Sequence, residues 1–242
     1  MSLLEEICAN RAKQVQEKKA LYPIALLEKS AYFKAETVSL KAYLNRSDKS
    51  GIIAEFKRKS PSKGIINAYA DVKDTTISYM QGGASALSVL TEPTYFAGKD
   101  EDLTEARKAN YCPILRKDFI VDEYQILEAR SIGADAILLI AATLDKQRLA
   151  QYHSTARKLG LEVLIEVHSE EELEQLPVSD FVLGVNNRNL KTMEVNLQTS
   201  IDLASKLDNR YYLKVQAIFQ FSLALFYPEE ACCDCSLDVY LV

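Results

Sequence analysis

Four charged side chains in this sequence stand within or at the end of short apolar segments, where charges are rare. Glu55 and Lys57 are two residues apart, so on a β-strand their side chains point to the same face. Lys117 and Glu166 occupy two further segments of the same kind. Because a buried charge is costly unless it pairs or binds a ligand, two interpretations stand open: structural ion pairs, or a catalytic acid and base that face a common cavity.

The neighbours of these charges refine the second interpretation. Apolar residues around Lys117 would remove its ammonium group from water and lower its pKa into a range useful for proton transfer. His168 follows Glu166 by two residues and can share its face. For His168 we expect a hydrogen bond at the rim of the site rather than a catalytic role, and for His153 a place on the surface.

Two polar segments follow predicted strands. Residues 59–64, with the sequence KSPSKG, combine two hydroxyls, two cations and a glycine, which suits a phosphate group; a solvated basic turn is the alternative. Residues 184–190, with the sequence GVNNRNL, gather side-chain amides and a guanidinium group that could orient a carboxylate or a carbonyl. A capped polar turn is the alternative there.

These residues belong to a repeated alternation of apolar and amphipathic segments. The apolar segments predict β-strands at 52–57, 86–91, 113–119, 136–142, 163–168 and 181–186. The segments between and after them predict helices at 71–81, 100–110, 122–132, 145–159, 169–176 and 196–207. Three helical stretches, near 2–20, 23–29 and 39–45, precede the first strand. This order predicts an α/β fold with a parallel sheet covered by helices, either closed as a barrel or open.

The polar residues at the strand ends favour the barrel. An open parallel sheet binds its ligand at one switch point, whereas a barrel brings all its strand ends to one mouth. Nearly every predicted strand here ends in polar residues, which are Glu55, Lys57, Glu92, Lys117, Glu166 and Asn186.

The composition is that of a soluble globular chain. The 242 residues are 48% hydrophobic and 26% charged, which suits one large domain. A net charge of −5 argues against a general nucleic-acid binder. We find no apolar run long enough for a membrane span and no signal peptide, so we expect a cytoplasmic protein without membrane partners. The five cysteines suggest reduced thiols, and the spacing of Cys232, Cys233 and Cys235 fits no standard zinc site.

Five segments, taken in order, resemble the indole-3-glycerol phosphate synthase family. They are IIAEFKRKSPSKG, GGASALSVLTEPTYFAG, PILRKDFIVDEYQILEARSIGADAILLIAA, LGLEVLIEVHSEEEL and LGVNNRNL, and the resemblance runs from about residue 2 to residue 213. It implies a single-domain (β/α)₈ TIM barrel. On this expectation, residues 1–48 form an N-terminal helical extension, residues 51–213 form the barrel units, and residues 214–242 form a divergent tail.

The resemblance also implies a reaction and the residues that carry it out. The family closes the ring of 1-(2-carboxyphenylamino)-1-deoxyribulose 5-phosphate to give indole-3-glycerol phosphate, with loss of carbon dioxide and water and without a cofactor or metal. Lys117 falls on the family's general acid and Glu166 on its general base. Lys57 falls on the lysine that contacts the substrate carboxylate and can donate a proton during dehydration. Glu55 and Asn186 match polar groups that hold the intermediate.

Three further positions match substrate-binding residues of the family. By this resemblance Ser60 lies at the phosphate-binding loop, Phe119 at the wall of the aromatic pocket, and Arg188 at the rim, where it braces the substrate carboxylate and Glu55. The expected partner is therefore a phosphorylated small molecule, with the protein a monomer or a weak homo-oligomer.

The end of the chain departs from the family pattern. The family has a Ser-Glu-Ser-Gly-Ile segment in its seventh strand and a glycine-rich phosphate loop after its eighth, whereas this chain has no glycine after Gly184. We therefore expect the last one or two βα units to be atypical or incomplete, as at a truncated or frame-shifted end, which leaves the first strand with an open edge. Two alternatives to the synthase follow: a catalytically impaired barrel that serves as a binding or oligomerisation partner, and another phosphate-binding barrel such as phosphoribosylanthranilate isomerase.

Overall fold

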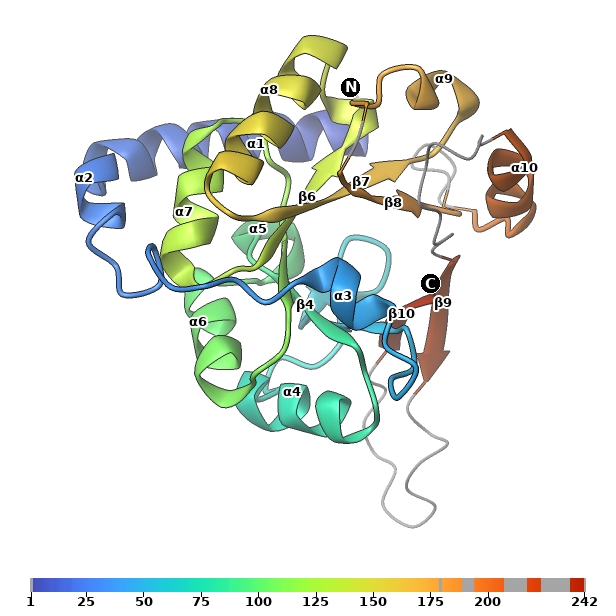
Figure 1. The fold of residues 1–242 in the computed structure, drawn as a ribbon, viewed down its shortest axis with the longest axis horizontal. Coiled ribbons are helices and arrows are strands. Elements are labelled where there is room, and N and C mark those ends of the chain that lie inside the picture. Colours follow the sequence, from blue (N-terminus) through green and yellow to red (C-terminus); the bar gives the residue numbers. More distant parts are fainter. Residues whose placement is uncertain (1, 179, 189–193, 207–216, 223–235, 242) are drawn as a thin grey trace.

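Six parallel strands form the centre of the computed structural model, which describes residues 2–178, 180–188, 194–206, 217–222 and 236–241. The strands lie side by side in chain order, as the βα repeat predicts. Figure 1 shows them curling, with helices along the outer side, so that the fold is a half-barrel consistent with an incomplete (β/α)₈ barrel. The six strands are β1 (Ile53–Phe56), β4 (Ala86–Leu90), β5 (Ile114–Lys117), β6 (Ala136–Ile140), β7 (Glu162–Val167) and β8 (Val182–Val185).

The predicted helices are confirmed, mostly to within one or two residues at each end. The extension before the barrel contains α1 (Leu3–Leu21), α2 (Ile24–Leu27) and α3 (Leu40–Leu44). The helices that follow strands are α4 (Val72–Gln81), α6 (Asp100–Ala109), α7 (Tyr124–Ile132), α8 (Lys146–Lys158), α9 (Glu170–Leu173) and α10 (Gln198–Lys206). A short 3₁₀ helix, η1 (Ala141–Thr143), follows β6.

Two local elements differ from the sequence-based expectation. Residues 59–64, whose composition predicts a short loop, form with Ile65 a small antiparallel hairpin of β2 (Lys59–Ser60) and β3 (Gly64–Ile65). Gly64 has a φ of +68°, which other residues rarely adopt, and this permits the tight return of the chain. A further short helix, α5 (Pro93–Phe96), follows β4.

The period of two along each strand separates the apolar residues into two clusters. One cluster joins the outer face of the strands to α4, α6, α7 and α8. The other fills the inner face, and Leu40 and Leu44 of α3 pack into it. Its strand residues are Ile53, Ala86, Leu115, Ala136, Leu138, Ile140, Leu164 and Val182. Beyond these positions, toward the C-terminal ends of the strands, the same inner rows continue into charged and polar residues.

The edge of β1 is paired, so the expectation that this edge would be open is wrong. Strand β10 (Ser236–Leu241) lies antiparallel to β1, and β9 (Ala217–Ser222) lies antiparallel to β10. Among the described residues the sheet thus has eight strands, in the order β8-β7-β6-β5-β4-β1-β10-β9, and Figure 1 shows the β9–β10 pair at its end. An antiparallel pair therefore stands where the barrel pattern has parallel βα units, as expected of an atypical end. Cys232, Cys233 and Cys235 lie outside the described residues. Within the described part of the chain, no helix is both long and apolar enough to cross a membrane.

Buried ion pairs attach the N-terminal helix to the barrel. Ile7, Arg11 and Val15 recur every four residues and form the buried face of α1. The Arg11 guanidinium donates two hydrogen bonds to Asp118, at 3.0 and 2.5 Å, and both side chains are almost fully buried. Thr91 also donates to Asp118, at 2.8 Å. Asp118 directly follows the last residue of β5, so this contact fixes α1 to the C-terminal end of that strand.

Replacing Arg11 should test this attachment. Arg11→Met keeps much of the side-chain volume but removes the positive charge, so the buried Asp118 carboxylate loses one of its two cationic partners. We expect the free energy of unfolding to fall by about 3 kcal/mol, the lower end for a broken buried ion pair, because Arg116 still pairs with Asp118. Urea denaturation followed by circular dichroism measures the change.

A matched control is Arg46→Met, which removes an exposed ion pair between Arg46 and Asp48. Its denaturation midpoint should remain that of the unaltered protein. If Arg11→Met shifted the midpoint no more than Arg46→Met, the Arg11–Asp118 pair would not be what fixes α1 to the barrel.

Candidate active site

The predicted strand-end charges meet at the inner face of the sheet, around a buried glutamate. The Glu55 carboxylate lies 3.2 Å from the Lys57 ammonium group through Oε1 and 3.2 Å from the Lys117 ammonium group through Oε2. Ser88, which pairs with Glu55 in the register of β1 and β4, donates to Oε2 at 3.4 Å. The side chains of Glu55, Lys57 and Lys117 are only 3%, 7% and 17% exposed. Two lysines from separate segments thus share one carboxylate in a largely dry site.

The electrostatics of this group correct our expectation for Lys117. Burial by itself lowers the pKa of Lys117, as expected, but the Glu55 and Glu166 carboxylates outweigh it and the pKa is raised. Burial lowers the pKa of Lys57, and the nearby Lys117 adds to that effect, although Glu55 opposes it. Burial raises the pKa of Glu55, but the two ammonium groups overcome it and hold the pKa below its usual range. Lys117 is therefore a firmly protonated group, whereas Lys57 gives up its proton more readily.

Glu166 lies on the inner face of β7, and Asn186 orients it. The Asn186 side-chain amide donates to Glu166 Oε1 at 3.0 Å, and the Glu166 side chain is 6% exposed. Asn186 follows β8 directly, and its backbone N–H donates to the Val167 carbonyl, which continues the β7–β8 ladder by one residue. The Asn186 side-chain oxygen in turn accepts from the backbone N–H of Arg188 at 2.9 Å. One side chain thus links the predicted base to the loop that carries Arg188.

Two aromatic rings pack against each other at the inner apolar cluster. Phe119, which follows β5, packs against the inner apolar cluster and against Phe96 of α5, with ring centroids 5.9 Å apart and planes at 35°. Glu92 sets the position of α5, because its carboxylate accepts from the backbone N–H groups of residues 94, 95 and 96. Glu92 is therefore a buried helix cap and not, as the strand-end pattern suggested, a group of the barrel mouth.

Ser60 lies in the hairpin that follows β1. It is buried, and its hydroxyl accepts from the backbone N–H of Lys63 at 3.2 Å and lies 3.5 Å from the Ser62 hydroxyl. These contacts are local to the β2–β3 turn, so the structure fixes the conformation of the predicted phosphate loop. They do not join Ser60 to the group around Glu55.

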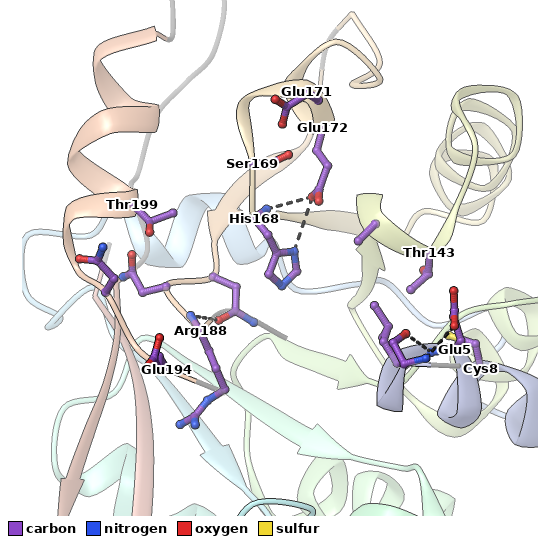
Figure 2. Close-up of a pocket in the computed structure, with 16 residues that line it drawn as sticks. Glu5, Cys8, Thr143, His168, Ser169, Glu171, Glu172, Arg188, Glu194 and Thr199 are labelled. Atoms are coloured by element: carbon purple, nitrogen blue, oxygen red, sulfur yellow. Dashed lines mark hydrogen bonds and ion pairs between the residues drawn. The ribbon is translucent and has the colours of Figure 1, made fainter. Parts of the chain in front are cut away.

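A cavity of about 800 Å³ opens beside Asn186 and Arg188. It lies between the N-terminal end of α1, the loop after β6, the loop after β7 and the segment from β8 to α10, as Figure 2 shows. His168 and Glu172 line it from one side, and Arg188 and Glu194 from another. The N-terminal extension therefore forms one wall of the space next to the predicted catalytic groups.

The structure thus brings together Glu55, Lys57, Lys117, Glu166 and Asn186, with Phe119 and Arg188 beside them. Sequence reasoning missed Phe96 and Ser88. Proline in the first position of a helix after a capping glutamate was the signal for α5, and hence for Phe96. The alternation along β4 was the signal for Ser88.

Comparisons with known proteins agree with this arrangement. A family model described as indole-3-glycerol phosphate synthase matches residues 4–218. An indole-3-glycerol phosphate synthase of Bacteroides thetaiotaomicron is 44% identical over 205 residues, which cover 85% of this chain and 78% of that protein. That of Laribacter hongkongensis is 43% identical over 205 residues, which cover 83% of this chain and 78% of that protein. With a match of this length and identity, the chain belongs to the indole-3-glycerol phosphate synthase family.

Proposed function

We propose that the candidate site carries out the ring closure of this family. The substrate is 1-(2-carboxyphenylamino)-1-deoxyribulose 5-phosphate, and the products are indole-3-glycerol phosphate, carbon dioxide and water. The observation that carries the proposal is the buried group at the barrel mouth, in which protonated Lys117 stands under the influence of the Glu55 and Glu166 carboxylates. An acid and a base that face one dry space are what this chemistry needs.

Lys117 is the general acid of the first step. As the aromatic carbon that bears the carboxylate attacks the ribulose carbonyl, negative charge develops on the carbonyl oxygen, and Lys117 gives it a proton. The new carbon–carbon bond forms, and carbon dioxide then leaves with its bonding electrons returned to the ring. The raised pKa of Lys117 serves this role, because the proton is present over the whole neutral range.

Lys57 and Glu166 serve the dehydration. The hydroxyl formed from the carbonyl leaves as water with a proton from Lys57, whose lowered pKa makes it the better donor of the two lysines at this stage. Glu166 takes the proton that the ring system loses as the indole double bond forms, and Asn186 holds Glu166 in place. The whole reaction consumes one proton, because Lys117 and Lys57 each give one proton and Glu166 takes one.

The remaining residues bind the substrate. Phe119, with Phe96 against it, offers an apolar wall to the aromatic ring. Arg188 stands at the edge of the cavity, where a guanidinium group suits a carboxylate. Ser60 offers its hydroxyl to the phosphate from the hairpin after β1. Neither the isomerase nor the inactive-barrel alternative gains support from the relatives, which are named as synthases over most of this chain.

Removing the acid tests the mechanism. Lys117→Ala should lower kcat by about 10²–10⁴-fold, the usual contribution of a general acid, while the far-UV circular dichroism spectrum stays unchanged. The measurement is the rise of indole fluorescence when purified protein is given the carboxyphenylamino-deoxyribulose phosphate. Lys108→Ala is the matched control, because Lys108 is exposed and pairs only with Glu105 among the contacts described for it. Near-normal turnover in Lys117→Ala would remove Lys117 from the acid role.

Glu55 controls the pH range of the acid. The Glu55 carboxylate raises the pKa of Lys117, so Glu55→Gln should lower that pKa, and the lysine should lose its proton at lower pH. Activity at high pH requires protonated lysine, so the basic limb of the kcat/KM profile should move to lower pH in Glu55→Gln. A basic limb that stayed at the same pH would show that Glu55 does not stabilise the charged acid.

A further inference from the structure

Asn187 lies between two residues of the candidate site, and the proposed mechanism gives it no role. Asn186 on one side of it donates a hydrogen bond to Glu166, and Arg188 on the other side lines the cavity together with Asn186. Asn187 is itself only 2% exposed, which is uncommon for an asparagine. A buried amide needs hydrogen-bond partners, and the side-chain partner of Asn187 lies outside the catalytic group.

The Asn187 side chain joins the segment after β8 to α10. Its Oδ1 accepts two hydrogen bonds from Ser200, one from the backbone N–H at 3.1 Å and one from the hydroxyl at 2.8 Å. Ser200 lies in the first turn of α10 and is 5% exposed. The Asn187 amide nitrogen has no hydrogen-bond partner among the described residues, so the oxygen alone holds the side chain. Asn187 thus supplies a buried acceptor to the start of the helix.

Backbone contacts reinforce this joint. The Asn187 carbonyl accepts from the backbone N–H of Asn196 at 2.9 Å, and Arg188 forms an antiparallel bridge with Val195. Residues 194–197 directly precede α10, so the segment after β8 is held against the segment that leads into the helix. The Asn187 side chain extends this pairing to the helix itself.

Helix α10 gives the contact a firm support. Leu203 of this helix is buried and belongs to the outer apolar cluster, together with Leu183 of β8. Asn187 therefore ties the segment to a helix that packs against the outer face of the sheet. Asn186 ties the same segment to Glu166 at the inner face. The two adjacent side chains hold the backbone between them from opposite faces.

We propose that Asn187 is a positioning residue for its two neighbours, Asn186 and Arg188. Its contact with Ser200 sets the backbone from which both side chains extend. The Asn186 side chain also accepts from the backbone N–H of Arg188 at 2.9 Å, so a shift at Asn187 reaches both residues. A displacement of about 1 Å near a reacting group can lower a rate by about 10²-fold. The proposal rests on the proposed function, in which Glu166 is the base and Arg188 binds the substrate carboxylate.

Removing the Asn187 side chain should lower activity without removing any group that contacts the substrate. In Asn187→Ala we expect kcat to fall by about 10- to 100-fold, because Asn186 no longer holds Glu166 in its productive orientation. KM should rise as well, because Arg188 moves away from the substrate carboxylate. The measurement is the rise of indole fluorescence at varied concentrations of the carboxyphenylamino-deoxyribulose phosphate.

Asn110→Ala is the matched control. The Asn110 side chain also makes two hydrogen bonds, to the Thr76 hydroxyl at 2.9 Å and to the Ala106 carbonyl at 3.0 Å. Asn110 lies between the end of α6 and the start of β5, which is the opposite end of the strands from the candidate site. Asn110→Ala should lower the free energy of unfolding, as Asn187→Ala does, but leave kcat as in the unaltered protein. Equal losses of kcat in the two variants would mean that Asn187 only supports the fold, and would overturn the proposal.

A double-mutant cycle shows whether the effect passes through Ser200. Ser200→Ala removes the hydroxyl but keeps the backbone N–H, so it weakens the contact with little risk to folding. In this variant kcat should fall by about two- to tenfold, the range of a single hydrogen bond. In Asn187→Ala the hydroxyl has already lost this acceptor, so adding Ser200→Ala should lower kcat no further. Losses that multiplied in the double variant would show that the two residues act separately, and would overturn the proposed contact.

An NMR measurement on Asn186 separates this inference from the proposed function. Nitrogen-15 in the asparagine side chains, with Asn186→Ser to identify the signal, reports the amide that donates to Glu166. In Asn187→Ala this signal should move toward that of an amide in water. An Asn186 signal that stayed in place would overturn the inference. If the signal moved but the unaltered protein formed no indole product, the proposed function would fail and the positioning of Asn186 would stand.

Discussion

The candidate site depends on one carboxylate, that of Glu55, which pairs with two buried lysines. Glu55 is buried beside two lysines, and without it the ammonium groups of Lys57 and Lys117 would repel each other in a space with little water. Neither lysine lies on the same segment as the other, so the parallel sheet must hold β1 and β5 in register through β4 for the three charges to meet. The sheet, the helices that cover its outer face, and α3, which packs into the inner apolar cluster, together hold these three charged side chains in place.

The alternation of side chains along β5 separates two kinds of charge on adjacent residues. Lys117 faces inward to the candidate site, while Arg116 and Asp118 face outward into a fully buried network. Arg116 pairs there with Glu128 of α7 at 2.6 Å, and Asp118 pairs with Arg11 of α1. Because the outward residues are fixed on both sides of Lys117, the strand end has little freedom to shift. The structural charges thus restrict the motion of the reactive one.

The sequence predicts the six strands, the helices between them and the charged inner face, because all of these follow from periodicity and from strand length. It does not predict the direction of the Lys117 pKa shift. That direction depends on Glu55 and Glu166, which belong to other strands and approach only when the sheet forms. Nor does it place β10 beside β1, because pairing between distant strands leaves no local pattern. The role of Glu92 was misjudged for a similar reason, since a carboxylate after a strand can equally cap the next helix.

The attachment of α1 has a consequence for the way the chain assembles. Arg11 and Asp118 are 107 residues apart, and Lys18 and Glu128 are 110 residues apart. During synthesis α1 leaves the ribosome long before its partners exist, and its buried cation has no counter-ion until β5 has joined the sheet. Closing so long a loop is slow compared with local helix formation, so we expect α1 to dock late in folding. Contacts that form late chiefly govern the rate of unfolding, so the strength of the ion pairs that hold α1 should determine how long the folded state lasts.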